Sequence, residues 1–255
     1  MYIYVKRFFL CIKIFTYLFN ISQLTNVELL NLLKQMKLIG PESIFITMIT
    51  SFFISLVFSI QIIKEFLYLN AINLVGSMLA TSFVRELSPV LTSVIIVGKI
   101  GSYFTSELAT MVVTEQIDAL YILGINPIYY LILPRIIAVV CILPLLNLFS
   151  IITSLISSAF TCFILYNIYP SFFFISAVAG FSFVDVVKSL LKTIIFGFFI
   201  SLISCIWGMT AKGGAKGVGL STTSSVVTSL LCIFILNFIL SYFMFNDLES
   251  LLKIL

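Results

Sequence analysis

Long apolar stretches with few or no charges recur along this chain of 255 residues and set its main pattern. The clearest of them cover residues 44–63, 87–106, 128–165, 193–211 and 218–245. A helix of about 20 apolar residues spans the hydrocarbon core of a bilayer, whereas a membrane barrel would show short alternating segments. The pattern therefore predicts an all-α, polytopic membrane protein with about five transmembrane helices. The stretch 87–106 carries Lys99 near its middle.

A sixth stretch, 66–84, is also uncharged, but its asparagines, serine, threonine and glycine weaken it as a span. Basic segments stay on the cytoplasmic side of a membrane, and the N-terminal segment contains Lys6, Arg7, Lys13, Lys34 and Lys37. With five spans, the acidic stretch near residue 115 and the lysine-containing loop near residue 212 both return to that side. With six spans, both would lie outside. We therefore expect five spans, with 66–84 not crossing the membrane.

Two regions of unequal size are expected. Residues 1–40 mix apolar and basic positions, which is typical of a helix that lies in the membrane interface. Gly40–Pro41 predicts a break in the chain, and Pro41 suits the first turn of a following helix. Residues 41–255 would then form one membrane domain.

Composition narrows the range of possible functions. Hydrophobic residues make up 61% of the chain and charged residues only 9%, and the net charge of +4 requires no nucleic-acid partner. Histidine is absent, which removes His-based zinc sites, His general bases and His-ligated haem. The five cysteines lie singly, as small packing residues do. We expect no enzyme activity, no metal and no cofactor. The heavy use of Phe, Ile, Asn and Lys is typical of an AT-rich genome such as that of a plastid.

An acidic island interrupts the apolar pattern at "VTEQIDALYILGINP", residues 113–127. Thr114 can cap a helix whose first residue is Glu115. Gly124 is a suitable helix stop, and Pro127 prevents continuation. The stretch predicts an amphipathic helix of about two turns between two spans.

The faces of this helix allow two interpretations. Ile117, Leu120 and Tyr121 form an apolar stripe at i, i+3 and i+4, and the polar residues Glu115, Gln116 and Asp118 lie off it. A short helix with such a stripe can dock into the groove of a partner. The alternative is a solvated loop helix without a partner.

Two charged residues fall within or at the end of a span. Lys99 and Glu107 are candidates for intramembrane functional charges, because charges inside a bilayer are costly. The alternatives are a helix–helix ion pair or snorkelling to the interface. Gly98, Gly101 and Ser102 on the same helix permit close helix packing.

Two blocks carry a family resemblance. They are "RELSPVLTSVIIVGKIGSYFTSELATMVVTEQIDALYILGINPIYYLILPR" (85–135) and "LLKTIIFGFFISLISCIWGMTAKGGAKGVGLSTTSSVV" (190–227). They resemble the signature regions of the MlaE family of ABC-transporter permeases, and the resemblance covers roughly residues 41–245. Lys99 replaces the family's arginine and Ser88 a usual glycine, and lysine lacks the bidentate fork of arginine.

The resemblance implies a homodimeric permease of a lipid-transporting ABC system, with an ABC ATPase subunit and an MCE-type substrate-binding subunit as partners. The acidic island is similar to the family's coupling helix, which sits on the ATPase. The residues implied in this coupling are Glu115, Gln116, Ile117, Asp118, Leu120, Tyr121 and Gly124.

A separate chain would have to bind the ATP. Gly208 and Gly213 have the spacing of a phosphate-binding loop, but Gly214 stands where that loop needs lysine. Two other functions stay open on the residues alone: a non-transporting membrane scaffold and an ATP-independent carrier. For localisation, the composition favours the plastid inner envelope, with a bacterial inner membrane as the alternative.

Overall fold

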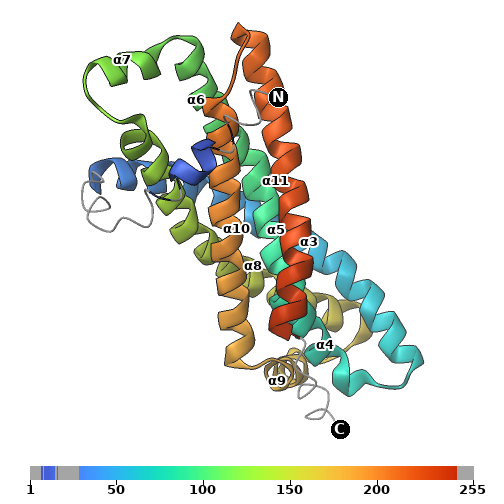
Figure 1. Cartoon of the computed structure of the whole chain (residues 1–255). Coiled ribbons are helices and arrows are strands. Elements are labelled where there is room, and N and C mark those ends of the chain that lie inside the picture. Colours follow the sequence, from blue (N-terminus) through green and yellow to red (C-terminus); the bar gives the residue numbers. More distant parts are fainter. Residues whose placement is uncertain (1–6, 8, 15, 17–28, 246–255) are drawn as a thin grey trace. The chain divides into compact units, whose positions relative to one another are not determined.

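The computed structural model describes residues 7, 9–14, 16 and 29–245, and within these residues it contains helices and no strands (Figure 1). The helices, in chain order, are α3 (Leu29–Tyr68), η1 (Ile72–Leu74), α4 (Val75–Ser82), η2 (Phe83–Leu87), α5 (Ser88–Ile96), η3 (Val97–Gly101), α6 (Ser102–Val113), α7 (Gln116–Ile122), η4 (Ile128–Ile132), α8 (Leu133–Tyr166), α9 (Pro170–Gly180), α10 (Phe183–Met209) and α11 (Gly214–Phe245). Of the η elements, η1 is a 3-10 turn and the other three are π-helical turns.

Five helical stretches of the described chain are long and apolar enough to cross a membrane, which confirms the all-α multi-pass fold. They cover Leu30–Tyr68, Ile72–Val113, Ile128–Tyr166, Phe183–Met209 and Gly214–Phe245. As expected, 66–84 forms no span of its own: residues 66–68 end the first stretch, and residues 72–84 begin the second, because α4 and η2 continue without a break into α5. Of its polar residues, Asn70 lies in the turn between the first two stretches, and the others lie in η1 and α4.

The expected break at Gly40–Pro41 is also wrong, since α3 runs through both residues. Proline removes one backbone hydrogen bond and crowds the carbonyl four residues earlier. Ending the helix inside an apolar environment would leave more backbone groups without partners than this single loss. The interfacial position expected for residues 1–40, half of which lie outside the described residues, stays a prediction.

The fourth span begins at Phe183, earlier than the expected start near residue 193. Ser182 and Asp185 explain this start. The Ser182 backbone N–H donates to Asp185 Oδ2 at 2.9 Å, and the Asp185 N–H donates to Ser182 Oγ at 3.3 Å. This reciprocal pair is a capping box, which satisfies backbone donors at the start of a helix. Asp185 therefore lies in the first turn of α10.

The contacts divide the chain into two compact units, and every one of the five long stretches contributes residues to both. The first unit comprises Met1–Ser43, Ser93–Leu143 and Ile194–Ile233. The second unit comprises Ile44–Thr92, Pro144–Thr193 and Phe234–Leu255. Each unit has its own apolar core.

The core of the first unit joins α6, η4, α8 and α10 to the described part of the N-terminal segment. Its buried members are Ile14, Leu108, Ile128, Ile132, Ile136, Leu202, Cys205 and Ile206. Arg7 adds polar contacts from the same segment: its guanidinium lies 3.5 Å above the Trp207 ring, and its Nε donates to Thr210 Oγ1 at 3.0 Å. Residues near the N-terminus are thereby held against α10.

Small residues bring helices of the second unit close together. Around the core formed by α3, α4, η2, α8 and α9, α4 packs on α9 through Gly76, whose hypothetical Cβ would lie 2.6 Å from the Phe173 carbonyl oxygen. Between α3 and α8, the hydroxyls of Ser51 and Thr153 are 2.6 Å apart, and Ser157 Oγ donates to the Phe52 carbonyl at 2.9 Å. Hydroxyl and glycine contacts of this kind let apolar helices pack tightly in a membrane.

Candidate functional site

The acidic island forms α7, a short helix between α6 and η4 in the first unit (Figure 1). Its beginning differs from the expectation. Thr114 does not cap α7; its hydroxyl donates to the Thr110 carbonyl at 2.8 Å and so serves the end of α6. The chain then turns at Glu115, which has φ +58°, and α7 starts at Gln116. Glu115 makes no side-chain capping bond to α7.

The end of α7 confirms the predicted stop at Gly124. This glycine has φ +75°, a left-handed conformation that costs glycine little. Its N–H donates to the Tyr121 carbonyl at 3.0 Å, and the Ile125 N–H donates to the Leu120 carbonyl at 2.9 Å. These two bonds make a Schellman motif. Left-handed residues therefore flank the helix at both ends.

The apolar stripe of α7 is divided between the interior and the surface. Ile117 is only 6% exposed and anchors the helix to its own unit, and Leu120 is half-buried. The most exposed large apolar residues lie at the end of α7 and directly after it: Tyr121 (51%), Ile122 (87%) and Leu123 (72%), which we call the apolar tip. Of the predicted stripe, only Tyr121 belongs to this tip, because Ile117 is buried within the chain and Leu120 is half-buried. Glu115, Gln116 and Asp118 are exposed.

Glu107, on α6, forms an ion pair with Arg135 on α8. Arg135 Nη2 donates to Glu107 Oε2 at 2.7 Å, and the arginine side chain is 2% exposed. Its guanidinium also lies 5.4 Å from the centre of the Phe104 ring. Of the interpretations open for Glu107, the structure places it in a helix–helix ion pair within the first unit.

Lys99 also has an acidic partner within the first unit. It lies in the π-helical turn η3, and its Nζ is 3.2 Å from Glu42 Oε2 on α3. Most of the Glu42 side chain is exposed, so water screens this pair more than the Glu107–Arg135 pair. On the same helix, Gly101 packs closely: its hypothetical Cβ would lie 3.1 Å from Ser204 Oγ on α10. Gly98 has open space instead.

A second polar cluster, in the second unit, was not predicted. Lys192 on α10 is fully buried, and its Nζ donates to both carboxylate oxygens of Glu86 at 3.1 Å and to Ser241 Oγ at 2.8 Å. Glu86 Oε2 also accepts from Asn237 Nδ2 at 3.1 Å. Beside this cluster, Arg85 holds Asp185 through its Nε at 3.1 Å and its Nη2 at 3.2 Å.

The missed cluster had two signals in the sequence. Arg85 and Glu86 open the first block of the family resemblance, and Ser182 and Asp185 have the serine-to-acid spacing of a capping box. Recognising that box would have extended α10 back over Lys192, where a lysine within a span marks a candidate functional charge. Three elements distant in sequence (η2, α10 and α11) complete the cluster, and no local pattern joins them.

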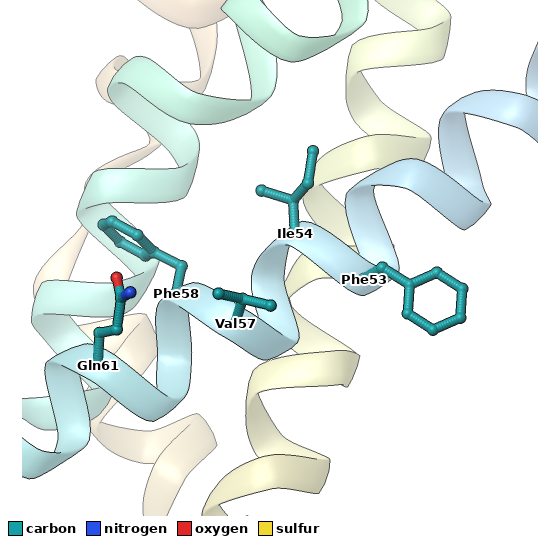
Figure 2. Close-up of a pocket in the computed structure, with 5 residues that line it drawn as sticks. All are labelled: Phe53, Ile54, Val57, Phe58 and Gln61. Atoms are coloured by element: carbon teal, nitrogen blue, oxygen red, sulfur yellow. The ribbon is translucent and has the colours of Figure 1, made fainter.

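The second unit also has an apolar groove along α3. Figure 2 shows the side chains that line it, Phe53, Ile54, Val57, Phe58 and Gln61. Its volume is about 340 Å³, and Gln61 is the only polar residue in its lining. The volume lies at the lower end of the range for small-molecule sites, about 300–1,000 Å³. Among the described residues, no group of three Cys, Asp or Glu side chains could hold a metal ion.

Comparison with known proteins agrees with this architecture. The model of the family "Permease MlaE" matches residues 32–243. The chain is 49% identical over 247 residues to the probable ABC transporter permease protein ycf63 of Pyropia yezoensis, covering 97% of this chain and 94% of the relative. It is 45% identical to the probable ABC transporter permease protein slr1045 of Synechocystis, covering 95% and 90%. It is also 45% identical to the chloroplastic protein TRIGALACTOSYLDIACYLGLYCEROL 1 of Arabidopsis thaliana, covering 88% and 64%.

The molecule is thus a multi-pass helical membrane protein of the transporter-permease class. Its chain belongs to the MlaE permease family, which confirms the resemblance in the two blocks.

Proposed function

We propose that this chain is the membrane subunit of an ABC transporter that moves lipids between membranes, driven by a separate ATPase that docks on α7. The apolar tip of α7 carries this proposal. A seven-residue helix that lies between two spans, with Tyr121, Ile122 and the following Leu123 exposed, has a surface that a partner can cover. The names of the relatives, which include ABC transporter permeases, support a partner of the ATPase class.

The docking would combine apolar burial with weak charge pairing. Full burial of an isoleucine or leucine side chain contributes about 1.5–3 kcal/mol, so Ile122 and Leu123 would supply most of the affinity. Glu115 and Asp118 are exposed and would face basic groups at the rim of the ATPase groove. Exposed ion pairs contribute about 0–1 kcal/mol each. The remaining residues of the predicted set, Gln116, Ile117 and Leu120, would hold the helix in place.

A force-transmitting element must stay attached to the spans that it moves, and Ile117 attaches α7 to the unit that contains α6 and the start of α8. Closure of an ATPase dimer would press on the apolar tip, and α6 and α8 would carry the movement into the spans. Two copies of the permease would then open or close a cavity for the lipid. Lys99 and Glu107 would take part through their ion pairs, which connect α6 and η3 to neighbouring helices.

The lipid is proposed from the groove on α3 and from a relative. The groove lining is apolar apart from Gln61, which suits an acyl chain, and each buried methylene contributes about 0.8 kcal/mol. The Arabidopsis relative carries a lipid in its name, and the same name places that protein in the chloroplast. We accordingly propose the plastid inner envelope membrane as the location and an MCE-type subunit as the substrate-binding partner.

The test is reconstitution of the purified permease with its ATPase in vesicles that contain fluorescent phospholipid. We expect both proteins to elute together, with two permease copies in the complex, and lipid to move only when ATP is hydrolysed. Vesicles with the permease alone serve as the control, and they should neither bind nor hydrolyse ATP. Lipid movement of equal rate without the ATPase would instead indicate an ATP-independent carrier. A complex that hydrolyses ATP without moving any lipid would refute the proposed substrate class.

A further inference from the structure

The Glu107–Arg135 ion pair occupies a particular place relative to α7. Glu107 lies on α6, before the short helix, and Arg135 lies on α8, after it, 28 residues further along the chain. The pair therefore joins the two ends of the segment 108–134, which contains α7 and which we call the α7 excursion. Both residues belong to the first unit, as does the whole of α7.

The burial of Arg135 makes this closure depend on Glu107. The arginine side chain is 2% exposed, and its Nε and Nη1 are buried without a hydrogen bond to the described chain. Its charge thus relies on one carboxylate oxygen at 2.7 Å and on the neighbouring Phe104 ring. A buried guanidinium that loses its counter-charge carries a large desolvation cost, so loss of Glu107 would weaken the contact between the two helices at this level, although Leu108 and Ile136 still pack in the apolar core.

The contacts of α7 itself are too few to fix its position. Ile117 is the only fully buried residue of the helix, and at each end the chain passes through a left-handed residue, Glu115 or Gly124. Force applied to the apolar tip would therefore bend these turns unless α6 and α8 resist as one body. An ion pair at the base supplies that resistance.

We infer that Glu107 and Arg135 are positioning residues that clamp the base of the α7 excursion, so that a push on α7 moves α6 and α8 together. This inference rests on the proposed function, because the push comes from the proposed ATPase. The clamp itself is a property of the chain alone and can be measured without the ATPase or a lipid.

The first measurement is hydrogen exchange of the backbone amides in residues 114–127 of the full-length permease. Glu107→Gln should raise their exchange rates at least tenfold. The swapped pair, Glu107→Arg with Arg135→Glu, should restore them to within about threefold of the wild type. Ser106→Ala is the matched control, since Ser106 lies beside Glu107 on α6 and its exposed hydroxyl donates to the Tyr103 carbonyl of the same helix. Unchanged exchange in Glu107→Gln would overturn the clamp.

The second measurement separates positioning from simple stabilisation. Glu107→Gln should lower the thermal midpoint, because it leaves the buried Arg135 without its counter-charge. In vesicles with the ATPase, at a temperature well below that midpoint, the variant should keep its ATPase association, but the lipid moved per ATP hydrolysed should fall at least fivefold. The swapped pair should recover at least half of that ratio. A wild-type ratio in Glu107→Gln would refute the coupling role. If the wild type moves no lipid while the exchange results hold, the proposed function fails and the clamp stands.

Discussion

The ammonium group of Lys192 lies 3.1 Å from each carboxylate oxygen of Glu86, although 106 residues separate the two along the chain. Lys192 is fully buried, while the Glu86 side chain remains 41% exposed. Ser241 and Asn237 on α11 complete the hydrogen bonding of the carboxylate. One ion pair thus connects η2 and α10, and its hydroxyl and amide partners add α11.

Removing the lysine charge should destabilise the protein. Lys192→Met leaves Glu86 without its counter-charge, and breaking a buried pair costs about 3–5 kcal/mol. Because Glu86 retains access to solvent, we expect the lower part of that range or less, about 1–3 kcal/mol. Thermal unfolding of the detergent-solubilised protein measures the change. Lys216→Met, at an exposed position, should shift stability by no more than about 0.5 kcal/mol.

The double variant Glu86→Gln with Lys192→Met tests the cause of that loss. It removes both charges, so no unpaired charge remains, and replacing both members of a buried pair is often nearly neutral. We expect it to be more stable than Lys192→Met alone. Equal loss in the single and the double variant would show that packing, and not charge, dominates at this position.

Glu115 should respond to substitution through its backbone. Its φ of +58° disfavours residues with a Cβ, and a left-handed conformation costs them about 1–2 kcal/mol. Glu115→Gly relieves this cost but adds freedom to the unfolded chain, worth about 0.4–1 kcal/mol. We expect the net effect to be neutral or slightly stabilising, whereas Glu115→Val should be destabilising because β-branched residues are outliers there. Thermal unfolding of both variants measures this difference in stability. Greater stability of the valine variant would contradict the left-handed turn at Glu115.

Two glycines in helices should respond with opposite signs to the same substitution. Gly76→Ala places a Cβ 2.6 Å from the Phe173 carbonyl oxygen and 3.1 Å from the Ala177 nitrogen, and such overpacking costs about 1–3 kcal/mol. Gly98→Ala meets nothing within 4 Å and gains helix propensity of up to about 1 kcal/mol. The comparison of the two unfolding midpoints tests whether α4 and α9 pack as described. A more stable Gly76→Ala variant would show that they do not.

Apolar runs and helix stops were readable from the sequence because each rests on neighbouring residues. Gly124 ends α7 as predicted, since a left-handed stop is a local property of glycine. The predicted break at Pro41 was wrong because the surroundings of α3, and not the residue itself, decide whether a proline ends a helix. The burial of Ile117 within its own chain could not be predicted either, because periodicity identifies an apolar stripe but does not show which element packs against it.

The sequence identified charged residues at unusual positions, but it did not predict which of them form ion pairs. Lys99 and Glu107 stood out within apolar stretches, yet their partners Glu42 and Arg135 lie on other helices. Pairing requires the register of one helix against another, which depends on packing of the whole unit. The placement of Lys192 beside Glu86 depends in the same way on the start of α10 at Phe183.

The apolar tip of α7 gives the most direct test of the proposed docking. Ile122 is 87% exposed, so Ile122→Asp should leave insertion and folding of the permease unchanged. If the ATPase covers this residue, the variant loses about 1.5–3 kcal/mol of apolar burial and adds a desolvated charge. Association should therefore weaken at least tenfold, because 1.4 kcal/mol corresponds to a factor of about ten. Pull-down of the ATPase from solubilised membranes and ATP hydrolysis in the same sample measure the effect.

The matched control for the tip is a change in charge on the same helix. Asp118→Asn keeps the shape of an exposed side chain and removes a rim charge, whose pairing is worth about 0–1 kcal/mol. Its association should fall by no more than about fivefold, which corresponds to the upper end of that energy range. A larger effect at Asp118 than at Ile122 would assign the docking to charge. Normal association and coupling in both variants would leave α7 a solvated loop helix, and the ATPase would have to dock elsewhere.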